Sequence, residues 1–88
     1  MFGGRRVAVV MPARDEAEHI AAAIDSIPDW VDAVLVIDDG STDETGDIAR
    51  AQERSNWTPL VLRTDGLGVG GAISTGYRML SDLVDANL

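Results

Sequence analysis

Two adjacent carboxylates are the residues best suited to chemistry: Asp38 and Asp39 directly follow the apolar run Ala33–Ile37. Charge at the end of a buried strand is costly, so carboxylates there usually accept hydrogen bonds from a base or ribose, or hold a metal. Because successive strand residues point to opposite sides, we do not expect the pair to share one role. Turn chemistry is the alternative, since Asp-Gly favours a turn and Ser41 or Asp43 can cap the next helix. Capping does not require both carboxylates.

A second polar cluster, Pro12–Glu16, joins a predicted strand end to a predicted helix start. Pro12 restricts the direction in which the chain leaves the strand, and Arg14 and Glu16 are placed to approach a base or ribose. In the alternative interpretation, Asp15 and Glu16 only stabilise the positive end of a helix dipole, and Arg14 is solvated.

Glycines concentrate in a third cluster, between Gly66 and Gly76. The segment Gly68–Gly76 resembles a phosphate cradle, in which glycines let backbone N–H groups at a helix N-terminus approach an anion. Its spacing matches neither the P-loop pattern nor the dinucleotide fingerprint, whose glycines follow the first strand of their unit. A structural role is equally open, because glycine lets a helix pack closely on a sheet, at the helix start and again at Gly76.

The hydrophobic pattern predicts the elements that bring these clusters together. Short apolar runs predict strands, and apolar residues at three- and four-residue spacing predict helices. In chain order we expect a strand at Val7–Met11 ended by Pro12, a helix at Glu16–Ile27, a strand at Ala33–Ile37 ended by the two aspartates, a helix from the capping segment Ser41–Glu44 to about Arg54, a strand at Leu60–Leu62, and a helix from about Gly70 to Val84. The first two strands are typical of strands buried on both faces of a parallel sheet.

Alternating strands and helices with short connections indicate right-handed crossovers, so we expect an α/β fold that forms half of an open three-layer parallel-sheet domain. Ligands of such sheets bind outside the carboxyl ends of the strands, where all three clusters fall. Trp30 and Trp57 precede the second and third strands and should cover the opposite edge. The helix positions expected to face the sheet are Ile20, Ala23, Ile24 and Ile27, then Ile48, Ala49 and Ala51, then Ile73, Tyr77, Leu80 and Val84.

The composition permits one small domain. The chain has 88 residues, with 15 acidic side chains, 7 basic ones and no cysteine, and its formal charge is −8. This charge argues against a nucleic-acid surface or an anionic membrane patch. The longest apolar run is far shorter than the roughly 20 residues of a membrane span, and the N-terminus lacks the features of a signal peptide. We therefore expect a cytoplasmic protein, in which the single His19 is solvated.

Three motifs, Val7–Glu16, Val34–Asp43 and Gly68–Tyr77, occur in the order in which family 2 glycosyltransferases carry them. The chain resembles the N-terminal part of that family, and its third motif is most similar to the polyprenyl-phosphate sugar transferases, the group that includes dolichol-phosphate mannose synthase. The resemblance implies the nucleotide-binding, Rossmann-like half of a GT-A fold. It also implies transfer of a sugar from a GDP- or UDP-sugar to a polyprenyl phosphate or glycan, with Mg²⁺ or Mn²⁺ as the metal.

The same resemblance assigns roles residue by residue. The implied substrate-binding residues are Pro12, Arg14, Glu16, Ile37, Asp38 and Asp39. Ile37 and Asp39 would contact the base or ribose, with Asp38 as a supporting neighbour. Asp15 stands where the family usually has Asn, and Arg14 where it commonly has an aromatic residue, so the base is left open.

The family continues past the glycine-rich helix to an Asp-x-Asp motif that holds the metal, and no such motif follows that helix in these 88 residues. We therefore expect residues 1–88 to be one partial domain without a catalytic residue or metal ligand, inactive alone but, in full-length form, able to act at the cytoplasmic face of a membrane. The alternative is a non-catalytic nucleotide-binding module, or one that self-associates through an unpaired sheet edge. A lesser alternative is a nucleotidyltransferase relative.

Overall fold

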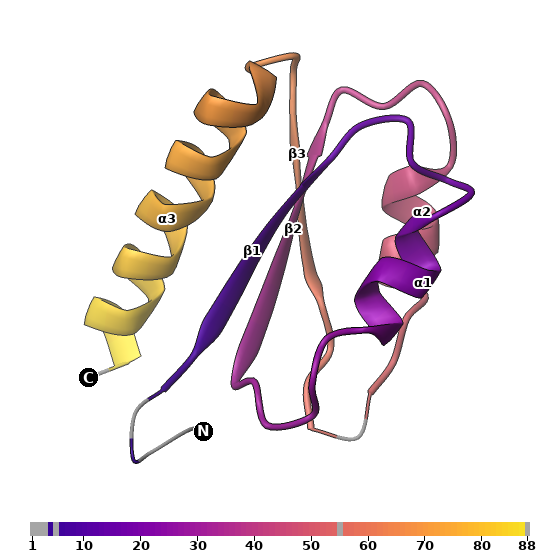
Figure 1. The fold of residues 1–88 in the computed structure, drawn as a ribbon. Coiled ribbons are helices and arrows are strands. Elements are labelled where there is room, and N and C mark those ends of the chain that lie inside the picture. Colours follow the sequence, from indigo (N-terminus) through magenta and orange to yellow (C-terminus); the bar gives the residue numbers. More distant parts are fainter. Residues whose placement is uncertain (1–3, 5, 55, 88) are drawn as a thin grey trace.

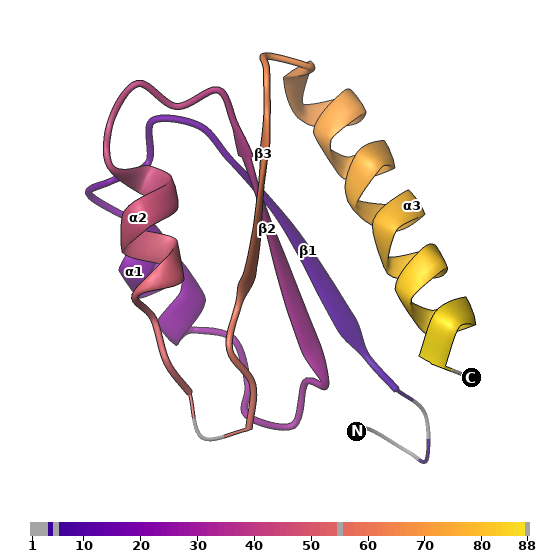
Figure 2. The ribbon, with the colours of Figure 1, turned by 180° about the vertical axis from the view of Figure 1, so that it is seen from behind.

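Three parallel strands form one sheet between two helical layers in the computed structural model (Figure 1). The strands are β1 (Ala8–Ala13), β2 (Ala33–Asp39) and β3 (Leu60–Thr64), in that order across the sheet, and the helices are α1 (Ile20–Asp25), α2 (Thr45–Arg50) and α3 (Gly68–Asn87). Helices α1 and α2 lie on one face and α3 lies on the other, as the view from behind also shows (Figure 2). The structure describes residues 4, 6–54 and 56–87, with side chains as far as residue 82. The predicted α/β class and element order are confirmed.

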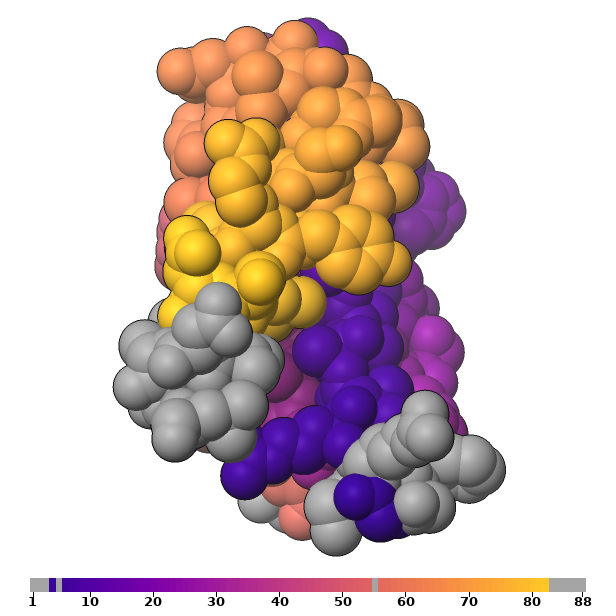
Figure 3. All heavy atoms as spheres, turned by 90° about the vertical axis from the view of Figure 1, so that its left-hand side faces the viewer, coloured from indigo at the N-terminus to yellow at the C-terminus, as the bar shows by residue number. Residues whose placement is uncertain are grey.

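The central strand β2 is the buried one. All its residues except Ala33 are buried, because β1 and β3 pair with its two edges and helices cover both faces. Strand β1 lies at one edge of the sheet, and its four central residues are only half-buried. Seen from the α3 side, part of β1 remains visible beside the helix (Figure 3). The expectation that the first strand is buried on both faces is therefore wrong.

Each strand extends beyond its predicted end. Strand β1 runs through Pro12, which is paired in register with Ile37. A proline is tolerated there because an edge strand need not donate every N–H to a neighbour. Strand β2 includes both Asp38 and Asp39, which pair in register with Arg63 and Thr64 of the lengthened β3. The two aspartates are thus the last two residues of β2, whereas the sequence predicted that they lie beyond the strand.

The core has two parts because side chains of β2 alternate between the faces of the sheet. The buried residues on the α1–α2 face are Ala13, Ile20, Ile24, Ile27, Val31, Val34, Val36, Ala49 and Trp57. Those on the α3 face are Leu35, Ile37 and Ala72, with Val10, Leu62, Met79 and Leu80 packed against them. The smaller second cluster holds α3 against the sheet.

Gly76 sets the distance between α3 and the sheet. A Cβ atom at this position would lie 2.6 Å from Val10 Cγ1 and 3.4 Å from Ile37 Cδ1. We expect Gly76→Ala to cost about 1–3 kcal/mol through overpacking, which outweighs the roughly 1 kcal/mol that alanine gains over glycine in a helix. A Cβ atom at Gly70 would meet open space, so the matched Gly70→Ala should stabilise the fold by about 0.5–1 kcal/mol. Urea unfolding measures both, and equal stabilisation would contradict the close approach.

The helices differ from their predicted bounds. The helix expected over Glu16–Ile27 is observed as Ile20–Asp25, the one expected to end near Arg54 ends at Arg50, and the one expected from Gly70 to Val84 spans Gly68–Asn87. Arg54, which lies beyond the end of α2, contacts the end of α1 and Trp57. The Arg54 guanidinium donates to the Ile24 and Ile27 carbonyl oxygens at the end of α1, and it lies 4.8 Å from the centroid of the Trp57 ring.

Some predicted sheet-facing positions are exposed. Ala51 lies just beyond α2 and is exposed, and Tyr77 on α3 is 64% exposed, so both predictions are wrong. Of the two tryptophans, Trp57 is buried in the core whereas Trp30 is 47% exposed. The side chain of Val84 lies outside the described residues. Within residues 4, 6–54 and 56–87, no helix has the length and apolar character needed to cross a membrane.

Candidate functional site

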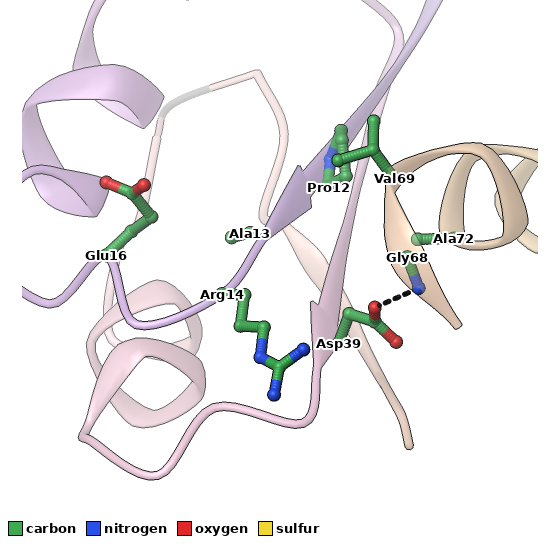
Figure 4. A pocket seen from close by; sticks show the side chains of 8 residues that line it. All are labelled: Pro12, Ala13, Arg14, Glu16, Asp39, Gly68, Val69 and Ala72. Carbon is green, nitrogen blue, oxygen red and sulfur yellow. Dashed lines mark hydrogen bonds between the residues drawn. The ribbon is translucent and has the colours of Figure 1, made fainter. Parts of the chain in front are cut away.

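A cavity of about 310 Å³ opens where β1 and β2 end and α3 begins (Figure 4). Its lining consists of Pro12, Ala13, Arg14, Glu16, Asp39, Gly68, Val69 and Ala72. Three of these residues are ionisable, Arg14, Glu16 and Asp39, and the others are apolar or glycine. This is the edge at which ligands of open parallel sheets bind.

Four of the six predicted site residues line this cavity: Pro12, Arg14, Glu16 and Asp39. The Arg14 guanidinium extends toward Asp39, whereas the Glu16 carboxylate points to the other side of the β1–α1 connection (Figure 4). There Glu16 also lines a neighbouring cavity of about 180 Å³, together with the exposed His19. Arg14 and Asp39 are therefore the pair that a ligand in the larger cavity meets together.

Asp39 anchors the start of α3. Its Oδ1 atom accepts hydrogen bonds from Thr64 Oγ1 at 2.6 Å and from Leu67 N at 2.8 Å, and its Oδ2 atom accepts one from Gly68 N at 2.8 Å. The Thr64 hydroxyl, followed by the Leu67 N–H, holds the pKa of Asp39 below its ordinary value, so the carboxyl group is charged at neutral pH. The Gly68 N–H, which the phosphate-cradle interpretation left for an anion, is bound to this carboxylate.

Asp38 lies on the opposite face of the sheet, as the alternation along a strand predicts. It is 2% exposed; its Oδ2 atom lies 3.2 Å from Arg63 Nη1, and its Oδ1 atom accepts a hydrogen bond from Ser41 N at 3.2 Å. A Cβ atom at Gly46 would lie 2.5 Å from the same carboxylate, so α2 packs directly on it. Ile37 is fully buried beneath α3. Neither Asp38 nor Ile37 lines the cavity.

The β1–α1 connection is held by side chains of the β2–α2 connection and of the first residue of α2. The backbone N–H groups of Asp15, Glu16 and Ala17 donate to Ser41 Oγ at 2.9 Å, Thr45 Oγ1 at 2.8 Å and Asp43 Oδ2 at 3.2 Å. In return, Thr42 N donates to Asp15 Oδ1 at 2.8 Å. We call these four hydrogen bonds the loop clasp. They hold the connection that precedes α1, and that helix begins at Ile20.

The loop clasp occupies Asp15 and Ser41, two residues that were candidates for helix capping, whereas Asp43 keeps its expected capping role at α2. Asp15 has φ 51, a left-handed conformation that Asp and Asn tolerate better than most residues, and its carboxylate bonds to Thr42 and not to a helix end. Ser41 caps no helix, whereas Asp43 does accept the Thr45 N–H at the start of α2. The Thr45 hydroxyl also lowers the pKa of Asp43. Sequence reasoning missed the clasp, because hydrogen bonds between connections 26 to 29 residues apart leave no local pattern.

The α3 wall of the cavity is formed by Gly68, Val69 and Ala72, which belong to the predicted glycine-rich cluster but were not among the predicted site residues. The available signal was the position of the glycine-rich segment next to the carboxyl ends of the strands. No group of three or more His, Cys, Asp or Glu side chains that could hold a metal occurs within the described part of the chain. We therefore assign no metal ligands to these residues.

The family model of glycosyl transferase family 2 matches residues 8–82, which include every strand and every residue that lines the cavity. This chain belongs to glycosyl transferase family 2. The three-stranded parallel sheet with its helices is consistent with the N-terminal half of the GT-A domain of this family. Because the chain belongs to this family, the alternative that it is a nucleotidyltransferase relative is dropped.

Two curated relatives agree with this assignment. The chain is 37% identical over 76 residues to the undecaprenyl-phosphate mannosyltransferase of Micrococcus luteus, covering 83% of this chain and 31% of that protein. It is 48% identical over 46 residues to the glucosyl-3-phosphoglycerate synthase of Mycolicibacterium paratuberculosis, covering 48% of this chain and 14% of that protein. The chain thus spans less than a third of either relative's length. No solved structure gave a significant match.

Proposed function

We propose that this family 2 glycosyltransferase takes a sugar from a GDP- or UDP-sugar donor and transfers it to a polyprenyl phosphate or another glycan. We also propose that the cavity at the strand ends binds the nucleoside of the donor. The observation that carries the proposal is the convergence of Arg14 and Asp39 at the carboxyl ends of the strands, within a segment that belongs to this family. The name of the Micrococcus luteus relative favours a polyprenyl phosphate as acceptor.

The charges of the cavity favour the nucleoside over the diphosphate. Two carboxylates, Glu16 and Asp39, and one guanidinium, Arg14, line the cavity, so the summed charge of these side chains is negative and disfavours a phosphate group. An uncharged ring fits better, because Pro12 and Val69 contribute apolar surface to the cavity lining. Polar atoms on the edge of that ring can then pair with Asp39 and Arg14.

Binding of Mg²⁺ or Mn²⁺ with the donor stays a prediction. Such a metal would supply Lewis-acid stabilisation of the diphosphate leaving group. Asp39 is not proposed as its ligand, because its carboxylate already accepts three hydrogen bonds, one from Thr64 of β3 and two from Leu67 and Gly68 at the start of α3. A cytoplasmic location, at the membrane face for a polyprenyl acceptor, is likewise proposed.

Self-association is the second candidate. It rests on β1, which lies at an edge of the described sheet and remains partly uncovered beside α3 (Figure 3). Pro12 weakens this candidate, because a proline in that strand removes one N–H from the row that a further strand would use. Nucleotide binding without sugar transfer is the other form of a non-catalytic module. A direct assay of sugar transfer distinguishes this module from the proposed enzyme.

The proposal is tested by replacing Arg14. We expect isothermal titration of the protein at its natural length to show UDP or GDP binding, which Arg14→Ala weakens by about tenfold, the value of one charge-assisted hydrogen bond. Arg78 is exposed on α3 and does not line the cavity, so Arg78→Ala serves as the matched control with unchanged affinity. Absence of nucleotide binding, or equal losses in both variants, would reject the cavity as the donor site.

A further inference from the structure

Ser41 holds the backbone next to Arg14, although Ser41 itself does not line the cavity. Its Oγ atom accepts the Asp15 N–H at 2.9 Å, and that N–H belongs to the peptide group that joins Arg14 to Asp15. Ser41 is only 3% exposed, so its hydroxyl is a buried acceptor. A buried hydroxyl that orients the peptide group beside a cavity-lining residue can influence the cavity without touching a ligand.

Ser41 is itself fixed by a buried carboxylate and its ion-pair partner. The Ser41 N–H donates to Asp38 Oδ1 at 3.2 Å, and the Ser41 carbonyl oxygen accepts a hydrogen bond from Arg63 Nη2 at 3.0 Å. The Nη1 atom of the same guanidinium lies 3.2 Å from Asp38 Oδ2. Charge buried as deeply as that of Asp38, which is 2% exposed, is costly unless it is paired. This pair therefore fixes both backbone polar groups of the residue whose hydroxyl holds Asp15.

The hydroxyls of Ser41 and Thr45 hold the peptide groups on either side of Asp15. Thr45 is fully buried, and its Oγ1 atom accepts the Glu16 N–H at 2.8 Å. Two successive planar peptide groups set φ and ψ of the residue between them, and here Asp15 has φ 51. This left-handed residue separates Arg14, which lines the larger cavity, from Glu16, whose carboxylate points to the other side of the connection (Figure 4).

We propose that Ser41 is a positioning residue of the donor site and acts through Arg14. Its hydroxyl keeps Asp15 in the left-handed conformation that directs the Arg14 guanidinium into the cavity. This inference rests on the proposed binding of the donor nucleoside in that cavity. A nucleotide binds only those molecules in which Arg14 is placed to meet it, so loss of the Ser41 hydroxyl lowers the apparent affinity without removing a ligand contact.

A double-mutant cycle tests whether Ser41 acts through Arg14. In titrations of the protein at its natural length with UDP and with GDP, we expect Ser41→Ala to weaken nucleotide binding about fivefold, the value of one ordinary hydrogen bond. The double variant should bind no more weakly than Arg14→Ala alone, because the residue through which Ser41 acts is already gone. Ser74 is exposed on α3 and does not line the cavity, so Ser74→Ala is the matched control with unchanged affinity.

Three results of the cycle would overturn this inference. Independent losses would multiply to about fiftyfold in the double variant and would show that Ser41 does not act through Arg14. Unchanged affinity in a Ser41→Ala protein that is folded by circular dichroism would show that the hydroxyl positions nothing. Failure of the wild-type protein to bind either nucleotide would reject the proposed function and this inference with it.

A second pair of variants decides the question if Ser41→Ala does not fold. Asp15 is exposed, and both Asp15→Gly and Asp15→Ala remove its carboxylate, but glycine adopts positive φ freely whereas alanine does not. We expect the glycine variant to bind nucleotide about fivefold more tightly than the alanine variant. Equal affinities in the two folded variants would show that the left-handed conformation does not position Arg14 and would overturn the inference.

Discussion

Replacing Asp39 with alanine is expected to abolish the nucleotide-induced NMR shifts of the protein. The carboxylate is the one negative group that both faces the cavity and holds α3 in place, through the N–H groups of Leu67 and Gly68. Its removal deletes a charge-assisted hydrogen bond to the ligand and also releases the wall formed by Val69. We expect nucleotide affinity to fall by at least about 30-fold, because the loss of one such bond alone reaches this range.

The control for this variant is Asp82→Ala on α3. Asp82 is exposed and lies outside the cavity, so its replacement changes the net charge equally without touching the site. Circular dichroism separates lost binding from lost folding. Asp39→Asn adds a finer comparison, because the amide keeps one acceptor oxygen. A folded Asp39→Ala protein with unchanged nucleotide affinity would contradict the assignment of Asp39 to the site.

Replacing Ile37 with alanine is expected to cost about 2–5 kcal/mol of unfolding free energy, the usual range for deleting a buried Ile side chain. Ile37 is fully buried on the central strand and packs beneath α3, near Gly76. The cavity that the Ile37→Ala substitution leaves cannot close fully in so small a core, which adds to the loss of stability. Leu60 is 53% exposed on β3, and Leu60→Ala should cost far less, about 0.5 kcal/mol or below. Denaturant midpoints measure both.

The milder Ile37→Val separates packing from ligand contact. It should cost about 0.5–1.5 kcal/mol and leave nucleotide affinity unchanged, because Ile37 does not line the cavity. Family resemblance instead places Ile37 against the base or ribose. A large affinity loss in Ile37→Val with little loss of stability would favour direct contact over the buried position that the structure shows.

Much of the sheet was predictable because its signals are local. The apolar run Ala33–Ile37 indicates the buried central strand, and side-chain alternation along a strand separates Asp38 from Asp39 before any coordinates are known. The strand–helix order places the polar clusters at one edge of the sheet. The family was also evident from the sequence, because its motifs are short and keep their order.

Tertiary structure decided what depends on partners distant in the chain. The β1–α1 connection is held by hydrogen bonds from its backbone N–H groups to Ser41, Thr45 and Asp43, which lie 26 to 29 residues away in the chain. The half-burial of β1 follows from its place at the sheet edge, which no composition encodes.

The division is sharpest at the site itself. The sequence by itself determined that carboxylates stand at the end of the central strand and that a glycine-rich helix follows. Only the fold brought Thr64, Leu67 and Gly68 onto Asp39 and so determined how many acceptor positions remain for a ligand. Residue types set which hydrogen bonds a side chain can make. Which of them are already satisfied depends on contacts across 25 to 29 residues, and local pattern cannot report those contacts.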